Sequence, residues 1–187
     1  MDNPPDLSPE EVIHSISIAF GGVNRYGGIS WSQTVAIGGQ EGDRRRFEAR
    51  AKDTDHDWHE LVYDANWRPD CTVGGWGFLD PISFRYYLPA AMTRCVNSGE
   101  DEGIVHHLIL DPPPEEQRGW LRRALRWPNV RERTLKRWSG LNLAQQRCIR
   151  DFLRYMAATD KSEEVWAKFR WSSTWAKALA SYWDSVK

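Results

Sequence analysis

A chain of 187 residues suits one domain, large enough to bury about 70% of the surface it exposes when unfolded. Hydrophobic residues make up 41% and charged residues 27%, which is typical of a globular protein. No apolar run approaches the ~20 residues that cross a bilayer, and the acidic, proline-containing start is unlike a signal peptide, so no membrane association is expected. Three cysteines without a CxxC pair indicate a reducing compartment, and we expect a cytoplasmic protein.

The charge is unevenly distributed although the net charge is only −1. Residues 1–111 carry 9 Lys and Arg against 18 Asp and Glu, whereas residues 112–187 carry 16 against 8. Such an asymmetry indicates either that the two halves attract each other or that one of them meets a partner of opposite charge. Eleven tryptophans predict a heavily aromatic core, an aromatic partner surface, or both.

The first two predicted elements are capped helices. Ser8-Pro9-Glu10-Glu11 is a capping box with proline at the first helical position, and the helix it opens ends at Gly21-Gly22. Ser30 and Gln33 form a similar cap for a short helix that ends at Gly38-Gly39. The stretch from Gly42 to Arg46 is predicted to be a loop, and no glycine-rich stretch carries the lysine and hydroxyl of a phosphate loop.

An acidic cluster with histidines lies between Asp53 and Glu60. Its carboxylates predict an N-cap, supplied by Asp55 or Asp57, for a helix over residues 58–63. A metal site is the alternative, although no spaced ligand set such as HExxH is present and neither a metal nor a cofactor is expected. If the protein were an enzyme, this cluster would be the group to test: Asp55, His56, Asp57 and His59.

The run from Phe78 to Met92 is predicted to be the centre of the fold. Asp80 before Pro81 is a strong helix start, and Pro89 is predicted to divide the run into two short helices. Arg85 is flanked by aromatic residues and would need a carboxylate or carbonyl partner if buried. We therefore expect an ion pair between Asp57 and Arg85.

Residues 104–110 are β-branched and short, and are predicted to be a strand with His106 and His107 on opposite faces. Residues 111–138 follow as a basic, tryptophan-rich insertion, helical and broken at Pro128. Arginine interleaved with tryptophan fits a nucleic-acid surface, a surface for an acidic protein partner, or a solvated face over an aromatic core. The candidate contact residues here are Arg122, Arg123, Arg126, Trp127 and Arg131.

Two further helices complete the prediction. Asn142 and Gln145 form a capping box for a helix with an apolar stripe that reaches Met156. Ser162 opens a last helix with aromatic residues at helical spacing as far as Trp183. The whole chain is predicted to be one mainly α domain over residues 1–187, with a small α+β arrangement as the alternative.

Three phrases of the sequence resemble an uncharacterised bacterial domain family. They are F-L-D-P-I-S-F-R-Y-Y-L-P-A-A-M at 78–92, the segment ending in Asp57-Trp58, and L-N-L-A-Q-Q-R-C-I-R-D-F-L-R-Y at 141–155. The sequence departs from the family pattern at Ile82-Ser83, where the family tends to have a small residue, and by the insertion at 111–138. The resemblance implies a fold and no particular activity.

The expected function is that of a protein-binding module, an immunity protein that inhibits a bacterial toxin by direct binding. The chain is small and charge-polarised, and it lacks catalytic phrases. The partner surface is expected to be either the basic insertion or the acidic region 41–64, through Glu41, Asp43, Asp53, Asp55 and Glu60. An enzyme using the cluster at 53–60 and nucleic-acid binding through 118–138 are the two alternatives.

Overall fold

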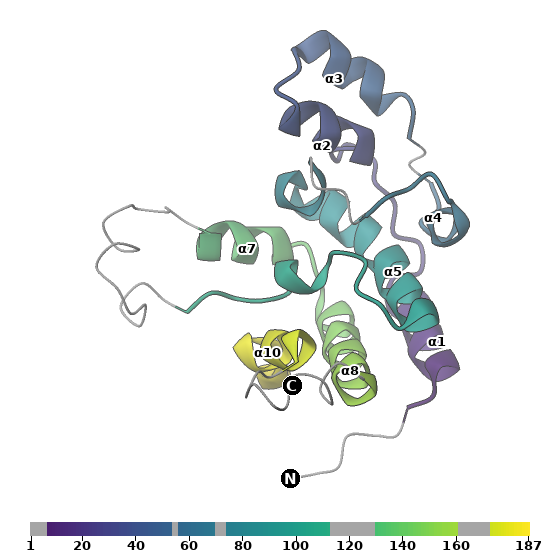
Figure 1. Ribbon diagram of the computed structural model, residues 1–187, viewed down its shortest axis with the longest axis vertical. Coiled ribbons are helices and arrows are strands. Elements are labelled where there is room, and N and C mark those ends of the chain that lie inside the picture. Colours follow the sequence, from purple (N-terminus) through teal and green to yellow (C-terminus); the bar gives the residue numbers. More distant parts are fainter. Residues whose placement is uncertain (1–6, 54–55, 70–73, 113–129, 161–172) are drawn as a thin grey trace.

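The computed structural model describes residues 7–53, 56–69, 74–112, 130–160 and 173–187. These residues form α-helices and short 3-10 helices joined by loops, with no strand among them, which confirms the mainly α prediction (Figure 1). None of the helices in these ranges is both long enough and apolar enough to cross a bilayer.

Helix α5 (Pro81–Ser98) is the centre of the fold (Figure 1). Asp80 caps it as predicted, accepting hydrogen bonds from the backbone N–H groups of Ile82 and Ser83, and Gly99 ends it in the left-handed conformation. Twelve of its 18 residues are buried, so the helix is surrounded by other elements instead of lying on the surface.

Pro89 does not divide this helix, contrary to the prediction from sequence. It lies inside α5 and is buried, and the helix continues through it. An interior proline costs about 3 kcal/mol because it removes one hydrogen bond and crowds the preceding turn. The burial of Leu88, Ala90 and Met92 on either side offsets that cost, since all three are fully removed from solvent.

Helix α1 packs against α5, and helix α8 packs against α1. Helix α1 (Pro9–Ala19) has the predicted capping box at Ser8 and Glu11, and packs against both α5 and α8. Helix α8 (Leu143–Thr159) has the predicted box at Asn142 and Gln145 and buries the stripe that reaches Met156. Helix α4 (His59–Tyr63) covers another part of α5 and contributes only five residues.

Helices α2 (Trp31–Gly38) and α3 (Asp43–Arg50) form a hairpin at one end of the molecule (Figure 1). The Ser30 capping box opens α2 as predicted. The predicted loop from Gly42 to Arg46 is instead the cap and first turn of α3. Asp43 in that first turn and Arg50 in the last both match the helix dipole, and ion pairs of Arg44 with Glu48 and of Arg45 with Glu41 lie along its surface.

The predicted strand at 104–110 is wrong, because these residues form a turn around the 3-10 helix η2 (Val105–His107). The Asp101 carboxylate accepts from the N–H groups of Ile104 and Val105 at 3.0 and 3.2 Å and folds the chain back. Further along, side chains take the place of a neighbouring strand: Trp183 donates to the Leu108 carbonyl at 2.8 Å, and the Leu110 N–H donates to Ser181.

The predicted last helix does not run unbroken from Ser162 to Trp183. Its first half lies outside the described residues, and α10 (Thr174–Ser181) begins after Ser173, whose backbone is extended and whose hydroxyl donates to Asp160 at 2.7 Å. The 3-10 helix η4 (Trp183–Ser185) follows. The basic insertion is described only from residue 130, as helix α7 (Val130–Trp138), and the predicted break at Pro128 lies outside the described residues.

The tryptophans form the core. All seven that the structure describes are at most 6% exposed, which confirms the core interpretation for them: Trp31, Trp58, Trp67, Trp76, Trp138, Trp175 and Trp183. Four of their indole N–H groups donate to backbone carbonyls: Trp58 to Phe20 and Trp76 to Pro69, both at 3.1 Å, Trp138 to His107 at 3.3 Å and Trp183 to Leu108 at 2.8 Å. Each of these indole N–H groups thus provides a hydrogen bond to a backbone carbonyl, while the ring fills the interior.

We expect Asp80→Ala to lower the free energy of unfolding by about 3 kcal/mol. The variant loses the cap of α5 and also the 2.7 Å hydrogen bond that Asp80 accepts from the Ile29 N–H. Asp80→Asn should lose less, because its amide oxygen can still cap the helix. Urea denaturation measures both, and Asn142→Ala, which loses a cap alone, serves as the control at about 1 kcal/mol. Equal losses in Asp80→Ala and Asn142→Ala would show that the bond to Ile29 contributes nothing.

Candidate partner-binding site

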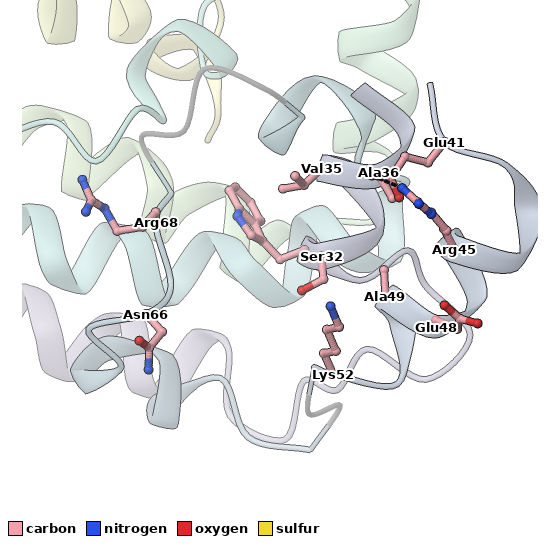
Figure 2. Close-up of a pocket in the computed structure, with 11 residues that line it drawn as sticks. Ser32, Val35, Ala36, Glu41, Arg45, Glu48, Ala49, Lys52, Asn66 and Arg68 are labelled. Atoms are coloured by element: carbon pink, nitrogen blue, oxygen red, sulfur yellow. Dashed lines mark ion pairs between the residues drawn. The ribbon is translucent and has the colours of Figure 1, made fainter. Parts of the chain in front are cut away.

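An open cavity of about 560 Å³ lies between the α2–α3 hairpin and the loop at 66–68. Figure 2 shows residues of α2 on one side of it, residues of α3 on another, and Asn66 and Arg68 across from them. The lining residues are Trp31, Ser32, Val35, Ala36, Glu41, Arg45, Glu48, Ala49, Lys52, Asn66 and Arg68. Its walls are apolar where α2 and α3 meet, and its rim is charged.

The apolar wall is rigid because Trp31 packs against aromatic residues of the core. Its ring makes edge contacts with Trp67, Trp76 and Tyr87 at centroid distances of 5.5, 5.3 and 5.3 Å. Its backbone N–H donates to the Tyr87 hydroxyl at 2.8 Å, and burial raises the pKa of that hydroxyl, so it stays protonated. Val35 is 41% exposed and presents the cavity with an apolar surface that a partner could cover.

The charged rim carries both signs. Glu41 lies 3.7 Å from Arg45 and Glu48 lies 2.9 Å from Arg44, so each carboxylate is paired along the surface of α3 or its entry. In Figure 2 the Glu41–Arg45 pair lies at the upper edge of the cavity, and the Lys52 side chain points from below toward Ser32. Pairs this exposed contribute little to stability, so they remain available to a partner.

The predicted acidic residues do not form one surface. Glu41 lines the cavity, Asp43 begins α3 at 3.6 Å from Arg46, and Glu60 is exposed on α4. Asp53 is used internally, because its carboxylate accepts from the Ser32 N–H and hydroxyl at 2.7 and 2.8 Å and so fixes the first turn of α2. Asp55 lies outside the described residues. Arg44, Arg45 and Arg46 further reduce the acidic character of this end of the molecule.

The candidate catalytic cluster divides into two separate pairs. His56 shares a 2.8 Å hydrogen bond with the Tyr26 hydroxyl, and the Asp57 carboxylate accepts from both the ring and the backbone N–H of His59 at 2.6 and 2.9 Å. These bonds from His59 lower the pKa of Asp57. Asp57 thus supports the start of α4 from one residue before the N-cap, which is Trp58, so Asp57 is not the N-cap that the sequence predicted. Within the described residues no three potential metal ligands gather.

The expected ion pair between Asp57 and Arg85 does not form. Asp57 is occupied by His59, whereas Arg85 donates to the Gly140 carbonyl at 3.3 Å, on the side of α5 that faces α7. The short helix α4 places its own backbone N–H two residues from Asp57, and a local donor is reached at a lower entropic cost than a guanidinium on another helix.

Most of the predicted basic contact residues lie outside the described residues, namely Arg122, Arg123, Arg126 and Trp127. Arg131 is described, at the start of α7, where it donates a hydrogen bond to the carbonyl of Asp111. Arg131 therefore has a structural partner within the chain.

Sequence reasoning missed the contact between Arg137 and His107. The Arg137 guanidinium donates to His107 Nδ1 at 3.4 Å and to the Gly77 carbonyl at 3.4 Å. Burial lowers the pKa of His107 to about 4, helped by the nearby charges of Arg137 and His106. The cavity residues were also missed, because they come from segments whose proximity no local pattern encodes.

In the described residues these features define a helical domain with a tryptophan core and a cavity at its α2–α3 end. The chain belongs to a family of unknown function, DUF6714, whose model matches residues 8–187. Neither the curated proteins nor the solved structures provide a match.

We expect acid to destabilise the protein through His107. The unfolded chain takes up a proton at this histidine near pH 6.5, but the folded chain does so only near pH 4, so protonation favours unfolding as the pH falls through that window. The contribution approaches about 3 kcal/mol by pH 4.

His107→Asn provides the test, because asparagine keeps an acceptor for Arg137 and does not titrate. We expect the unfolding free energy of the wild type, measured by urea denaturation from pH 7.5 to 4, to fall relative to that of the variant as the pH is lowered. A difference that stays constant with pH would contradict the buried neutral histidine.

Proposed function

We propose that the protein is a protein-binding module whose α2–α3 end receives a protruding segment of its partner. The observation that carries the proposal is the cavity of about 560 Å³, with its apolar wall at Trp31 and Val35 and a rim of mixed charge. An apolar centre surrounded by charged groups is the usual anatomy of a protein interface. The rigid wall also means that binding would order few side chains, which favours affinity.

The expected occupant is one apolar or aromatic side chain with charged neighbours. The cavity is open, so a side chain presented by a folded protein can enter it from solvent. Two further features of α3 support a protein as the partner. Phe47 is 74% exposed on this helix, and Arg44, Arg45 and Glu48 alternate around it. Exposed aromatic residues with arginine neighbours are typical of the residues that dominate binding energy at interfaces.

Within this class we propose an immunity role, in which the domain inhibits a bacterial toxin by covering part of its surface. Such inhibitors need a stable scaffold and a complementary surface, and no catalytic machinery of their own. The described residues fit that requirement, since the candidate catalytic histidines are each occupied by one neighbour, Tyr26 or Asp57.

Val35→Glu tests the binding site, because it places a charge on the apolar wall of the cavity. Val35 is 41% exposed, so folding stability should change by no more than about 0.5 kcal/mol. The matched control is Ile18→Glu on α1, where an apolar residue is 69% exposed away from the hairpin. A photo-reactive residue at position 35, compared with one at position 18, identifies the partner in cells by mass spectrometry.

With the partner purified, calorimetry should show that Val35→Glu weakens binding by about tenfold or more, and Ile18→Glu by less than about twofold. Equal effects of the two variants would overturn the assignment of the cavity. For the immunity role, expression of the partner alone should arrest growth, and co-expression of the wild type should restore it while Val35→Glu does not. If the partner is not toxic, the immunity role is wrong, whereas the proposal of a protein-binding module still holds.

A further inference from the structure

The charged residues that line the α2–α3 cavity define which sign of charge it accepts. Glu41 lies 3.7 Å from Arg45, and Glu48 lies 2.9 Å from Arg44, so each of these two carboxylates lies beside an arginine of α3. Lys52 lines the same cavity, just after the end of α3. A group that enters the cavity therefore meets two carboxylates whose charge an arginine partly neutralises, and a lysine ammonium.

Lys52 and the apolar wall face the same space. Figure 2 shows the Lys52 side chain extending from the end of α3 toward Ser32, in the first turn of α2. Trp31, Val35 and Ala49 line the same cavity. A lysine ammonium is a compact charge with three donors on a flexible stem, so it can adjust to an acceptor that arrives beside the wall. One ligand can thus contact the apolar wall and the cation together.

The cavity is larger than a single side chain requires. Its volume of about 560 Å³ lies in the range of sites that enclose a drug-sized molecule. Two neighbouring side chains of a partner segment can therefore enter together. The first is the apolar or aromatic side chain that covers Val35, and the second is the one that reaches Lys52.

The ion pairs of α3 decide the chemistry of the second side chain. A lysine or arginine of the partner would compete with Arg45 for Glu41 and with Arg44 for Glu48. It would also meet the like charge of Lys52, and juxtaposed like charges are costly at an interface. A phosphate group would bring a second negative charge close to the two lining carboxylates. A carboxylate, with a single charge, matches the single lysine ammonium.

We propose that the segment received by the α2–α3 cavity is acidic, with an aspartate or glutamate next to its apolar anchor, and that Lys52 pairs with this carboxylate. The inference rests on the proposed function, because it concerns what enters the same cavity. A charge at one position of an interface contributes to specificity by rejecting wrong partners. Lys52 thus selects among segments that the apolar wall alone would accept.

Displayed peptides of random sequence, selected on the full-length protein, test this inference. Peptides that bind the wild type and not Val35→Gln are those that enter the cavity. Glutamine places a polar amide on the apolar wall and, being uncharged, does not itself repel acidic peptides. We expect the cavity-dependent peptides to carry Asp or Glu next to an apolar or aromatic residue more often than the unselected library does.

Calorimetry then measures one such peptide and a version in which its acidic residue is replaced by the corresponding amide. Lys52→Met keeps an apolar stem and removes the charge, so it should weaken binding of the acidic peptide by about tenfold and change binding of the amide peptide by less than about twofold. The matched control is Lys136→Met, at an exposed lysine of α7 that is not part of the cavity lining. It should leave binding of both peptides unchanged.

The outcomes separate this inference from the proposed function. If no selected peptide loses binding in Val35→Gln, both the acidic segment and the assignment of the cavity are wrong. If cavity-dependent peptides are not enriched in acidic residues, the acidic segment is wrong and the protein-binding module still holds. The same conclusion follows if Lys52→Met binds the acidic peptide as tightly as Lys136→Met does.

Discussion

The Asp80 carboxylate connects the central helix α5, which forms the core, to the α2–α3 hairpin, which forms the cavity. One of its oxygens accepts from the first turn of α5, and the other accepts from the Ile29 N–H just before the Ser30 cap of α2. About two turns after Asp80 along α5, the Tyr87 hydroxyl accepts from the Trp31 N–H. Since a buried N–H without an acceptor costs about 1–3 kcal/mol, these bonds hold the start of α2 against α5. The wall of the cavity is thereby fixed by the core of the protein.

Local signals in the sequence were sufficient to predict where α1, α2, α5 and α8 begin. The boxes at Ser8, Ser30 and Asn142 and the cap at Asp80 all form as predicted, because each depends on residues two or three positions apart. The errors arose where distant residues decide the outcome. Pro89 is tolerated because other helices enclose it, and residues 104–110 turn because Trp183 and Ser181 satisfy their backbone.

The site was less predictable than the fold. Glu41 was the one predicted contact residue that also lines the cavity, because the other lining residues come from helix faces and a loop that meet only after folding. The acidic residues were misjudged for a similar reason: composition counts charges and does not show what each carboxylate binds. Asp53 accepts a hydrogen bond from the first turn of α2 and Asp57 accepts one from the first residue of α4, so both carboxylates are already used within the fold. The described tryptophans, in contrast, are buried, in agreement with the core that the composition predicted, because removing a large apolar ring from water is strongly favourable.

The same reasoning changes how the charge asymmetry should be understood. Several arginines of the basic second half bind the chain's own C-terminal segment: Arg150 donates to the Val186 carbonyl at 2.6 Å, Arg147 to the Lys187 carbonyl at 2.8 Å, and Arg154 to Asp184 at 2.8 Å. Arg137 is buried, and Arg44 and Arg45 of α3 are paired with Glu48 and Glu41. Much of the formal charge is therefore used within the fold. Long-range attraction, which depends on net field, should contribute less to partner choice than the shape of the cavity and the few charges at its rim.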